Sequence, residues 1–152
     1  MKFIIKRELL LKSLSNVSKV FGSKLLLPVL GNYKFSLRRE KLEILASNGE
    51  TTILDSIDTI NEYGEKVFEY TATGECLVPN RVLEIIRRLT GENISIDCID
   101  DSLLAIDDGN TSFKLNTIPS KEYPYISLDL TSDAVEVNAK EFGRSVQQVA
   151  FA

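Results

Sequence analysis

The residues of this chain that are best suited to catalytic chemistry are two pairs of neighbouring aspartates, Asp100-Asp101 and Asp107-Asp108. Carboxylates in such pairs can hold a divalent cation, and a water molecule on that cation could hydrolyse a phosphate ester. Both pairs nevertheless flank stretches with the composition of hairpin turns, where aspartate is favoured because its side chain bonds to nearby backbone N–H groups. We therefore predict that these aspartates form turns, and a metal-dependent hydrolase or nuclease remains a competing hypothesis.

The chain contains no histidine. Histidine is the commonest general base and the commonest metal ligand, so its absence excludes Ser-His or Cys-His nucleophilic catalysis and zinc sites built on histidine. No glycine-rich loop of the kind that cradles phosphates is present either. The sequence therefore predicts a protein without catalytic residues, cofactor or bound metal.

Two isolated cysteines, Cys76 and Cys98, each lie in a stretch that alternates like a strand. The count allows a disulfide. Residues 1–6 (MKFIIK) do not resemble a signal peptide, and the longest apolar stretch is far shorter than the roughly 20 residues of a membrane span. We expect a cytoplasmic protein in which both thiols are reduced and buried.

Positive charge is concentrated in two segments of an otherwise acidic chain. Residues 1–39 contain nine lysines and arginines against one acidic residue, and residues 81–91 contain three arginines against one glutamate. The segments 40–80 and 92–152 each carry a net charge of −7, and the whole chain is at −4. A protein with this distribution can present one electropositive surface to a polyanion while the rest of its field repels it. This favours a role in holding nucleic acid.

A short strand followed by an amphipathic helix occurs three times, at residues 2–21, 75–89 and 135–151. In each helix the apolar side chains recur at helical spacing on one stripe, and mostly basic or neutral polar side chains lie opposite. The stripes consist of Leu10, Leu14, Val17 and Phe21 in the first helix, Val82, Ile86 and Leu89 in the second, and Phe142, Val146 and Val149 in the third. The bases on the opposite faces are Lys12 and Lys19, then Arg87 and Arg88, then Lys140 and Arg144.

Between the helices, apolar residues alternate with polar ones at the period of two that is typical of half-buried strands. Turn-forming sequences separate these runs at residues 38–41, 48–49, 100–101 and 108–110, which predicts antiparallel hairpins. The resulting unit is a strand, a helix and three antiparallel strands, present once over about residues 1–60 and again over about 66–118. Two such units side by side give an α+β architecture in which two helices pack on antiparallel sheets.

The composition changes after Pro119. Residues 120–124 (SKEYP) have the character of a linker, and the third strand–helix copy begins near Val135. A strand and a helix cannot form a sheet domain alone. We therefore expect a first domain at residues 1–119, a linker at 120–134 and the truncated start of a second domain at 135–152, in the N-terminal part of a longer protein.

Five short motifs follow one another along the whole chain: residues 1–5 (MKFII), 27–32 (LPVLGN), 78–81 (VPNR), 112–116 (SFKLN) and 123–124 (YP). In this order they resemble the bacterial DNA polymerase III β subunit family, the sliding clamps. The resemblance implies the DNA-clamp fold and a three-domain subunit that forms a head-to-tail dimeric ring around duplex DNA, with helices lining the hole. It also implies a non-catalytic processivity factor that tethers the replicative polymerase.

The resemblance also implies functional residues. Lys24, in the loop after the first helix, and Arg81, at the start of the second, match positions that contact the DNA backbone, although Lys24 could instead be a solvated loop lysine. The helix faces add Lys12, Lys19, Arg87 and Arg88 as further candidates for DNA binding. Phe113 and Leu115 match an edge strand of the dimer interface, although alternation alone leaves open that both are core residues of a hairpin.

The implied partners are duplex DNA bound without sequence specificity, a second clamp subunit, and the DNA polymerase III α subunit and clamp loader. The family's groove for the last two lies between its second and third domains, outside this chain. The acidic residues Glu62, Glu65 and Glu69 match no family role.

The competing hypothesis for the function is a nucleic-acid-binding module that does not encircle its ligand. Such a module would place aromatics among its lysines, whereas the aromatics here alternate at core positions.

Overall fold

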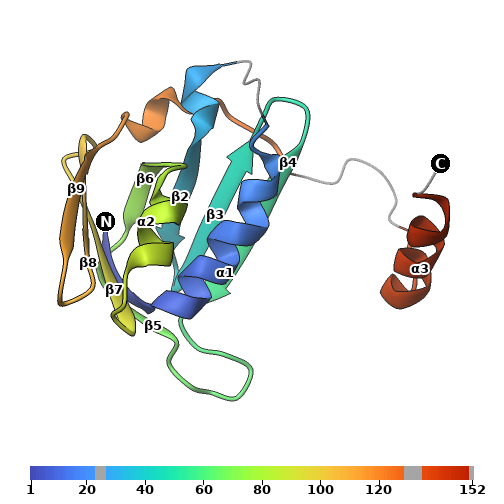
Figure 1. The fold of residues 1–152 in the computed structure, drawn as a ribbon, viewed down its shortest axis with the longest axis horizontal. Coiled ribbons are helices and arrows are strands. Elements are labelled where there is room, and N and C mark those ends of the chain that lie inside the picture. The colour runs from blue at the N-terminus through green and yellow to red at the C-terminus, as the bar shows by residue number, and fades with distance from the viewer. Residues whose placement is uncertain (23–26, 129–134, 151–152) are drawn as a thin grey trace.

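The computed structural model describes residues 1–22, 27–128 and 135–150. Within these residues the chain forms nine strands and three α-helices (Figure 1). The strands are β1 (Lys2–Lys6), β2 (Asn32–Arg38), β3 (Lys41–Ser47), β4 (Thr52–Asp58), β5 (Phe68–Ala72), β6 (Gly74–Pro79), β7 (Asn93–Ile99), β8 (Leu103–Asp107) and β9 (Ser112–Asn116). The α-helices are α1 (Arg7–Val17), α2 (Val82–Arg88) and α3 (Ala139–Val149), and the 3-10 turns are η1 (Ser18–Val20), η2 (Pro28–Gly31) and η3 (Ser120–Glu122).

The strands form two antiparallel sheets, and the two predicted units exchange their first strands between them. The five-stranded sheet has the order β5-β1-β7-β8-β9, and the four-stranded sheet has the order β4-β3-β2-β6. Strand β1 precedes α1, yet it pairs with β7 of the second unit, while β6 precedes α2 and pairs with β2 of the first unit. Neither unit therefore has a complete sheet of its own, and the described residues up to Asn116 fold as one body.

The core lies between the sheets and the two helices. Phe3 of β1 packs near Phe35 of β2 and Phe68 of β5, with ring centroids 6.4 and 6.2 Å apart, so aromatic contacts join the two sheets. The residues that alternate in the sequence are the ones that the fold buries, including Tyr33, Phe35, Leu37, Leu42, Ile44, Ala46, Ile94, Ile96, Cys98, Leu104 and Ile106. Burial of each such side chain contributes roughly 1.5–3 kcal/mol to folding, which is why the period of two predicted the strands correctly.

The four predicted hairpin turns are all present. Arg39 and Glu40 join β2 to β3 with φ of 47° and 66°, and Asp100 and Asp101 follow β7 with φ of 50° and 54°. Consecutive residues with positive φ give a tight turn whose twist matches that of the flanking strands. The prediction of an α+β fold with two helices on antiparallel sheets is confirmed.

Two details of these elements differ from the sequence prediction. Strand β5 was missed, because only Phe68 and Tyr70 alternate in a stretch rich in polar residues. Helix α1 ends at Val17, so Phe21 reaches the core from beyond η1, where it packs edge-on against Tyr33 at 4.9 Å. Serine and glycine near this point are poor helix formers, which explains the early end.

The third strand–helix copy is only partly formed. Residues 135–138 are not a strand, since no strand edge of the described residues pairs with them. Helix α3 does form, and the side chain of Asn138 caps it by accepting hydrogen bonds from the backbone N–H groups of Lys140 and Glu141. None of its side chains is buried. Within the described residues no helix combines the length and apolar character needed to cross a membrane.

The first residues of the expected linker pack against the outer side of the four-stranded sheet. Residues 120–122 form η3, and the next residue, Tyr123, is buried in a small second cluster with Leu30 and Leu77. Burial raises the pKa of Tyr123.

Both cysteines are free and buried, as predicted. Cys76 lies on β6 and Cys98 on β7, so the two thiols come from different sheets. A hydrogen bond between the thiols, together with burial, raises the pKa of Cys76 well above its usual value. Both residues belong to the main core.

Candidate nucleic-acid interface

Helices α1 and α2 lie side by side and present one shared outer surface (Figure 1). Each helix buries the apolar stripe expected from the sequence, through Leu10, Leu14 and Val17 in α1 and through Val82 and Ile86 in α2. Their opposite faces are solvated. The amphipathic pattern therefore fixes which side chains point away from the sheets.

A buried tyrosine supports the two helices from below. The hydroxyl of Tyr33 on β2 donates a hydrogen bond to the carbonyl oxygen of Leu14, at 3.5 Å. Burial raises the pKa of Tyr33 to about 12, although the nearby charge of Arg87 acts in the opposite direction. The phenol is thus neutral over the physiological range, and it ties α1 to the four-stranded sheet.

Four of the predicted DNA-binding residues lie exposed on or beside these helices without an ion-pair partner among the described residues. Lys12 projects from α1, Lys19 from η1 directly after it, Arg81 from the residue before α2, and Arg88 from the last position of α2. An exposed base without a partner acid keeps its full charge for a phosphate. These four cations thus lie exposed on or beside two neighbouring helices, with Lys12 at a groove that Asp55, Asp58 and Glu62 also line.

Arg87 differs from the other four. Its guanidinium forms an ion pair with Glu84 one helical turn earlier, at 2.5 Å between Nη1 and Oε1. Both side chains are about half exposed, so the pair is worth little to stability, but it partly neutralises the charge of Arg87. Lys24, the remaining predicted DNA contact, lies outside the described residues.

Five basic side chains on or beside the strands are arranged differently, because acids compensate them. Ion pairs join Lys2 to Asp97 at 2.9 Å, Lys34 to Glu75 at 3.2 Å, Lys41 to Asp58 at 3.6 Å and Lys66 to Glu69 at 2.9 Å, and Arg38 also pairs with Glu75. Burial acts to raise the pKa of Glu75, but the hydrogen bond from Lys34 and the charges of Lys34 and Arg38 hold it below its usual value. Acids thus compensate these five bases, whereas Arg39 and Lys114 have no ion pair among the described residues.

The sequence prediction did not include one exposed cation beside α1. Lys6 is the last residue of β1 and immediately precedes α1. The run of positive charge in residues 1–39 could have indicated it. The helical wheel did not, because Lys6 belongs to the strand.

Phe113 and Leu115 point toward the core side of β9, which is an edge strand of the five-stranded sheet. Leu115 is buried in the main core, and Phe113 is partly buried against it. Both residues therefore pack against the core of this chain. The backbone edge of β9 that faces away from β8 has no strand partner among the described residues.

The paired aspartates organise turns, as the sequence predicted. Asp107 accepts a hydrogen bond from the N–H of Gly109 at 2.7 Å. Asp108 accepts four, from the N–H groups of Thr90, Gly91, Asn110 and Thr111, at 2.7–3.0 Å. These bonds, chiefly those from Gly91 and Thr111, lower the pKa of Asp108 to about 2. Among the described residues no group of three or more potential ligands could hold a metal ion.

Comparison with known proteins gives one consistent result. Residues 1–128 match the family model described as DNA polymerase III beta subunit, N-terminal domain. The chain is similar to curated proteins named beta sliding clamp, with 26% identity to that of Staphylococcus epidermidis and 24% to that of Staphylococcus aureus, in each case over the whole chain and 40% of the relative. The chain thus spans about 40% of the length of these relatives.

Solved structures show the same fold. The DNA polymerase sliding clamp from Bacillus subtilis matches with a TM-score of 0.92 and 23% identity, over all of this chain and 40% of that one. The structure described as Caulobacter crescentus pol III beta matches with a TM-score of 0.84 and 27% identity, over all of this chain and 39% of that one.

Proposed function

Because the chain belongs to the DNA polymerase III beta subunit family through its N-terminal domain, we propose that it forms part of a sliding clamp. Such a clamp is a non-catalytic processivity factor that encircles duplex DNA and tethers the replicative polymerase. In this proposal α1 and α2 line the inner surface of a ring, and the two sheets form its outer rim.

The observation that carries the proposal is the unequal state of the basic side chains. Four cations on the α1–α2 surface have no partner acid among the described residues. Five bases on or beside the strands are paired, namely Lys2, Lys34, Arg38, Lys41 and Lys66, although Arg39 and Lys114 are not. A surface of this kind attracts phosphates without reading sequence, because no base-reading element accompanies it. Nonspecific attraction of phosphates is sufficient for a ring, because the closed ring itself, and not a high affinity, retains the DNA.

The further partners follow from the family. The proposed ring is a head-to-tail dimer, and the free edge of β9, which carries Phe113 and Leu115, would face the second subunit. The polymerase III α subunit and the clamp loader would bind a groove outside this chain. Residues 1–119 would be the first clamp domain, residues 120–134 the linker and residues 135–152 the start of the second domain, in a cytoplasmic protein.

The test is a salt titration of DNA binding. The chain should bind a fluorescent duplex weakly and without sequence preference. With about four phosphates neutralised, a log–log plot of the binding constant against salt should have a slope of about −3.6. The double variant Arg81→Gln/Arg88→Gln should reduce the slope by about 1.8. The matched control Lys114→Gln/Lys121→Gln removes the same charge elsewhere and should leave the slope unchanged.

Submicromolar affinity for DNA at physiological salt, or a clear sequence preference, would instead favour a module that binds nucleic acid directly without encircling it. An equal effect of the two double variants would show that net charge, and not the α1–α2 surface, determines binding.

A further inference from the structure

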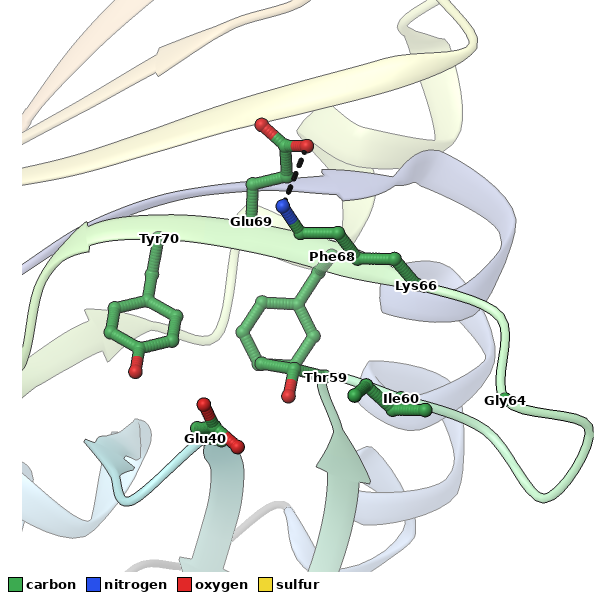
Figure 2. A pocket seen from close by; sticks show the side chains of 8 residues that line it. All are labelled: Glu40, Thr59, Ile60, Gly64, Lys66, Phe68, Glu69 and Tyr70. Carbon is green, nitrogen blue, oxygen red and sulfur yellow. Dashed lines mark ion pairs between the residues drawn. The ribbon is translucent and has the colours of Figure 1, made fainter.

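A cavity of about 270 Å³ lies between the two sheets, on a part of the surface that the proposed DNA contacts do not include (Figure 2). It opens between β5, the end of β4 and the turn that joins β2 to β3. The residues that line it are Glu40, Thr59, Ile60, Gly64, Lys66, Phe68, Glu69 and Tyr70. One of them, Glu69, is among the acidic residues for which the sequence offered no role.

The walls of the cavity are aromatic and fixed in place. Phe68 and Tyr70 are two residues apart on β5, so both project from the same face, with ring centroids 6.4 Å apart (Figure 2). Phe68 is almost fully buried and packs edge-on against Phe3, at 6.2 Å. Ile60, which is half exposed, adds an aliphatic side to the opening.

Backbone hydrogen bonds hold the cavity open in this shape. The N–H of Thr59 donates to the carbonyl oxygen of Glu40, and the N–H of Val67 donates to that of Thr59, both at 2.8 Å. The turn, the end of β4 and the approach to β5 are thus joined through Thr59. A ligand would meet a preformed site, which lowers the entropic cost of binding.

Oxygen atoms of three side chains lie around the opening: the carboxylate of Glu40 and the hydroxyls of Thr59 and Tyr70 (Figure 2). None of the three side chains has a hydrogen bond or ion pair with another described residue. Thr59 is only 7% exposed, so most of this residue is buried. Three neighbouring acceptor groups are complementary to a ligand that donates several hydrogen bonds.

The charge around the cavity points to a cation. Residues 59–70 contain three glutamates and one lysine, and Lys66 is already paired with Glu69 at 2.9 Å. Glu40 thus remains uncompensated at the opening, among the described residues. A nucleic acid would be repelled here. A calcium ion would require six to eight oxygen ligands, and three oxygens beside aromatic rings do not supply them.

We propose that this cavity binds the guanidinium group of an arginine presented by a partner polypeptide. Arginine has five N–H donors in one plane, which suits several acceptor oxygens, and its planar head stacks on aromatic rings. Its aliphatic stem can lie along Ile60. The volume of about 270 Å³ accommodates one long side chain. This site is separate from the DNA surface, and it gives the first clamp domain a protein contact of its own.

The test is an NMR titration of the ¹⁵N-labelled chain with the tripeptide acetyl-Gly-Arg-Gly-amide. The amide signals of residues 59–70 and Glu40 should shift saturably. A matched peptide with citrulline in place of arginine keeps the shape but lacks the charge, and it should bind at least about fivefold more weakly.

Two variants locate the interaction. Glu40→Gln should weaken arginine-peptide binding about fivefold with an unchanged melting temperature. Glu50→Gln, at the exposed turn between β3 and β4, does not touch the cavity and should bind like the unmodified chain. Equal binding of the two peptides, or no effect of Glu40→Gln, would overturn the proposal. So would a duplex DNA titration that shifts the same amides.

Discussion

Asp108 lies so close to Gly91 that its backbone leaves no room for a side chain at position 91. The carboxylate of Asp108 accepts a hydrogen bond from the N–H of Gly91 at 2.9 Å. A Cβ atom at position 91 would lie only 2.2 Å from the carbonyl oxygen of Asp108. The end of α2 is thereby joined to the turn between β8 and β9, which holds the helix that carries Arg81 and Arg88 against the five-stranded sheet.

The first prediction concerns acid stability. The pKa of Asp108 is about 2 in the folded chain against an ordinary value of 3.8, so the unfolded chain binds more protons between these values. The stabilisation from Asp108 should be complete above about pH 5 and should disappear as the pH falls toward 2. Asp108→Asn should therefore be less stable than the unmodified chain at pH 7, by a difference that shrinks on acidification. Urea unfolding from pH 2.5 to 7 measures this, and a difference independent of pH would contradict it.

Gly91→Ala should destabilise the chain by about 2–4 kcal/mol, because the added methyl group meets backbone rather than a side chain that could move away. Gly22→Ala is the matched control, since a Cβ there has no neighbour within 4 Å. The control should change the free energy of unfolding by less than about 1 kcal/mol. Urea denaturation of both variants gives the comparison. Similar effects at the two positions would show that the close contact is relieved by a shift of the turn.

Strand β1 should be essential to the whole body rather than to the first unit alone. Phe3→Ala removes a fully buried ring that contacts both Phe35 and Phe68, and should cost about 3–5 kcal/mol. Ile4→Ala changes the adjacent residue on the opposite face, which is 46% exposed, and should cost less than about 1 kcal/mol. Thermal unfolding followed by circular dichroism should show one cooperative transition in both cases. A separate early transition in Phe3→Ala would indicate that the two units fold independently.

Glu84→Gln should strengthen DNA binding. The substitution removes an acidic charge from the α1–α2 surface and frees the guanidinium of Arg87, with which Glu84 is paired. We expect about threefold tighter binding of duplex DNA at low salt, and a smaller gain as salt screens the charges. Glu122→Gln removes an exposed acid from η3 and serves as the control, with no change in affinity expected. Weaker binding by Glu84→Gln would mean that the ion pair positions Arg87 for its phosphate.

Helix α3 should promote self-association. Its apolar residues Phe142, Val146 and Val149 are 59%, 46% and 68% exposed, and such a stripe is unfavourable in water. Light scattering coupled to size-exclusion chromatography should show a mass that rises with concentration. Val146→Lys should abolish the rise, whereas Gln147→Lys, on the polar face of the same helix, should preserve it. A chain that stays monomeric at every concentration would refute this expectation.

The candidate DNA surface shows where sequence reasoning reached its limit. The helical wheel correctly placed Lys12, Arg87 and Arg88 on solvated faces, because a helix has one period and its apolar stripe must be buried. The wheel could not show that Arg87 is paired with Glu84 while Arg88 has no ion-pair partner among the described residues. That difference depends on side-chain positions, which the periodicity of a sequence does not encode.

The sequence by itself determined the local structure of this protein. Alternation with a period of two, helical stripes and turn-forming residues are properties of short segments, so the hairpins from β2 to β4 and from β7 to β9, and the helices between them, could be predicted directly. The charge of the helix faces followed in the same way. Strand β5 escaped only because its apolar pattern is short.

Only the tertiary structure decided which strands join which sheet. The first strand of each unit could have completed either sheet, because backbone N–H and C=O groups are the same at every strand edge. The choice of β1 for β7 and of β6 for β2 depends on how Phe3, Phe35 and Phe68 fill one shared core. The same packing brings Glu40 beside Thr59 and Tyr70, three residues from separate segments, and so creates a cavity that no local pattern could indicate.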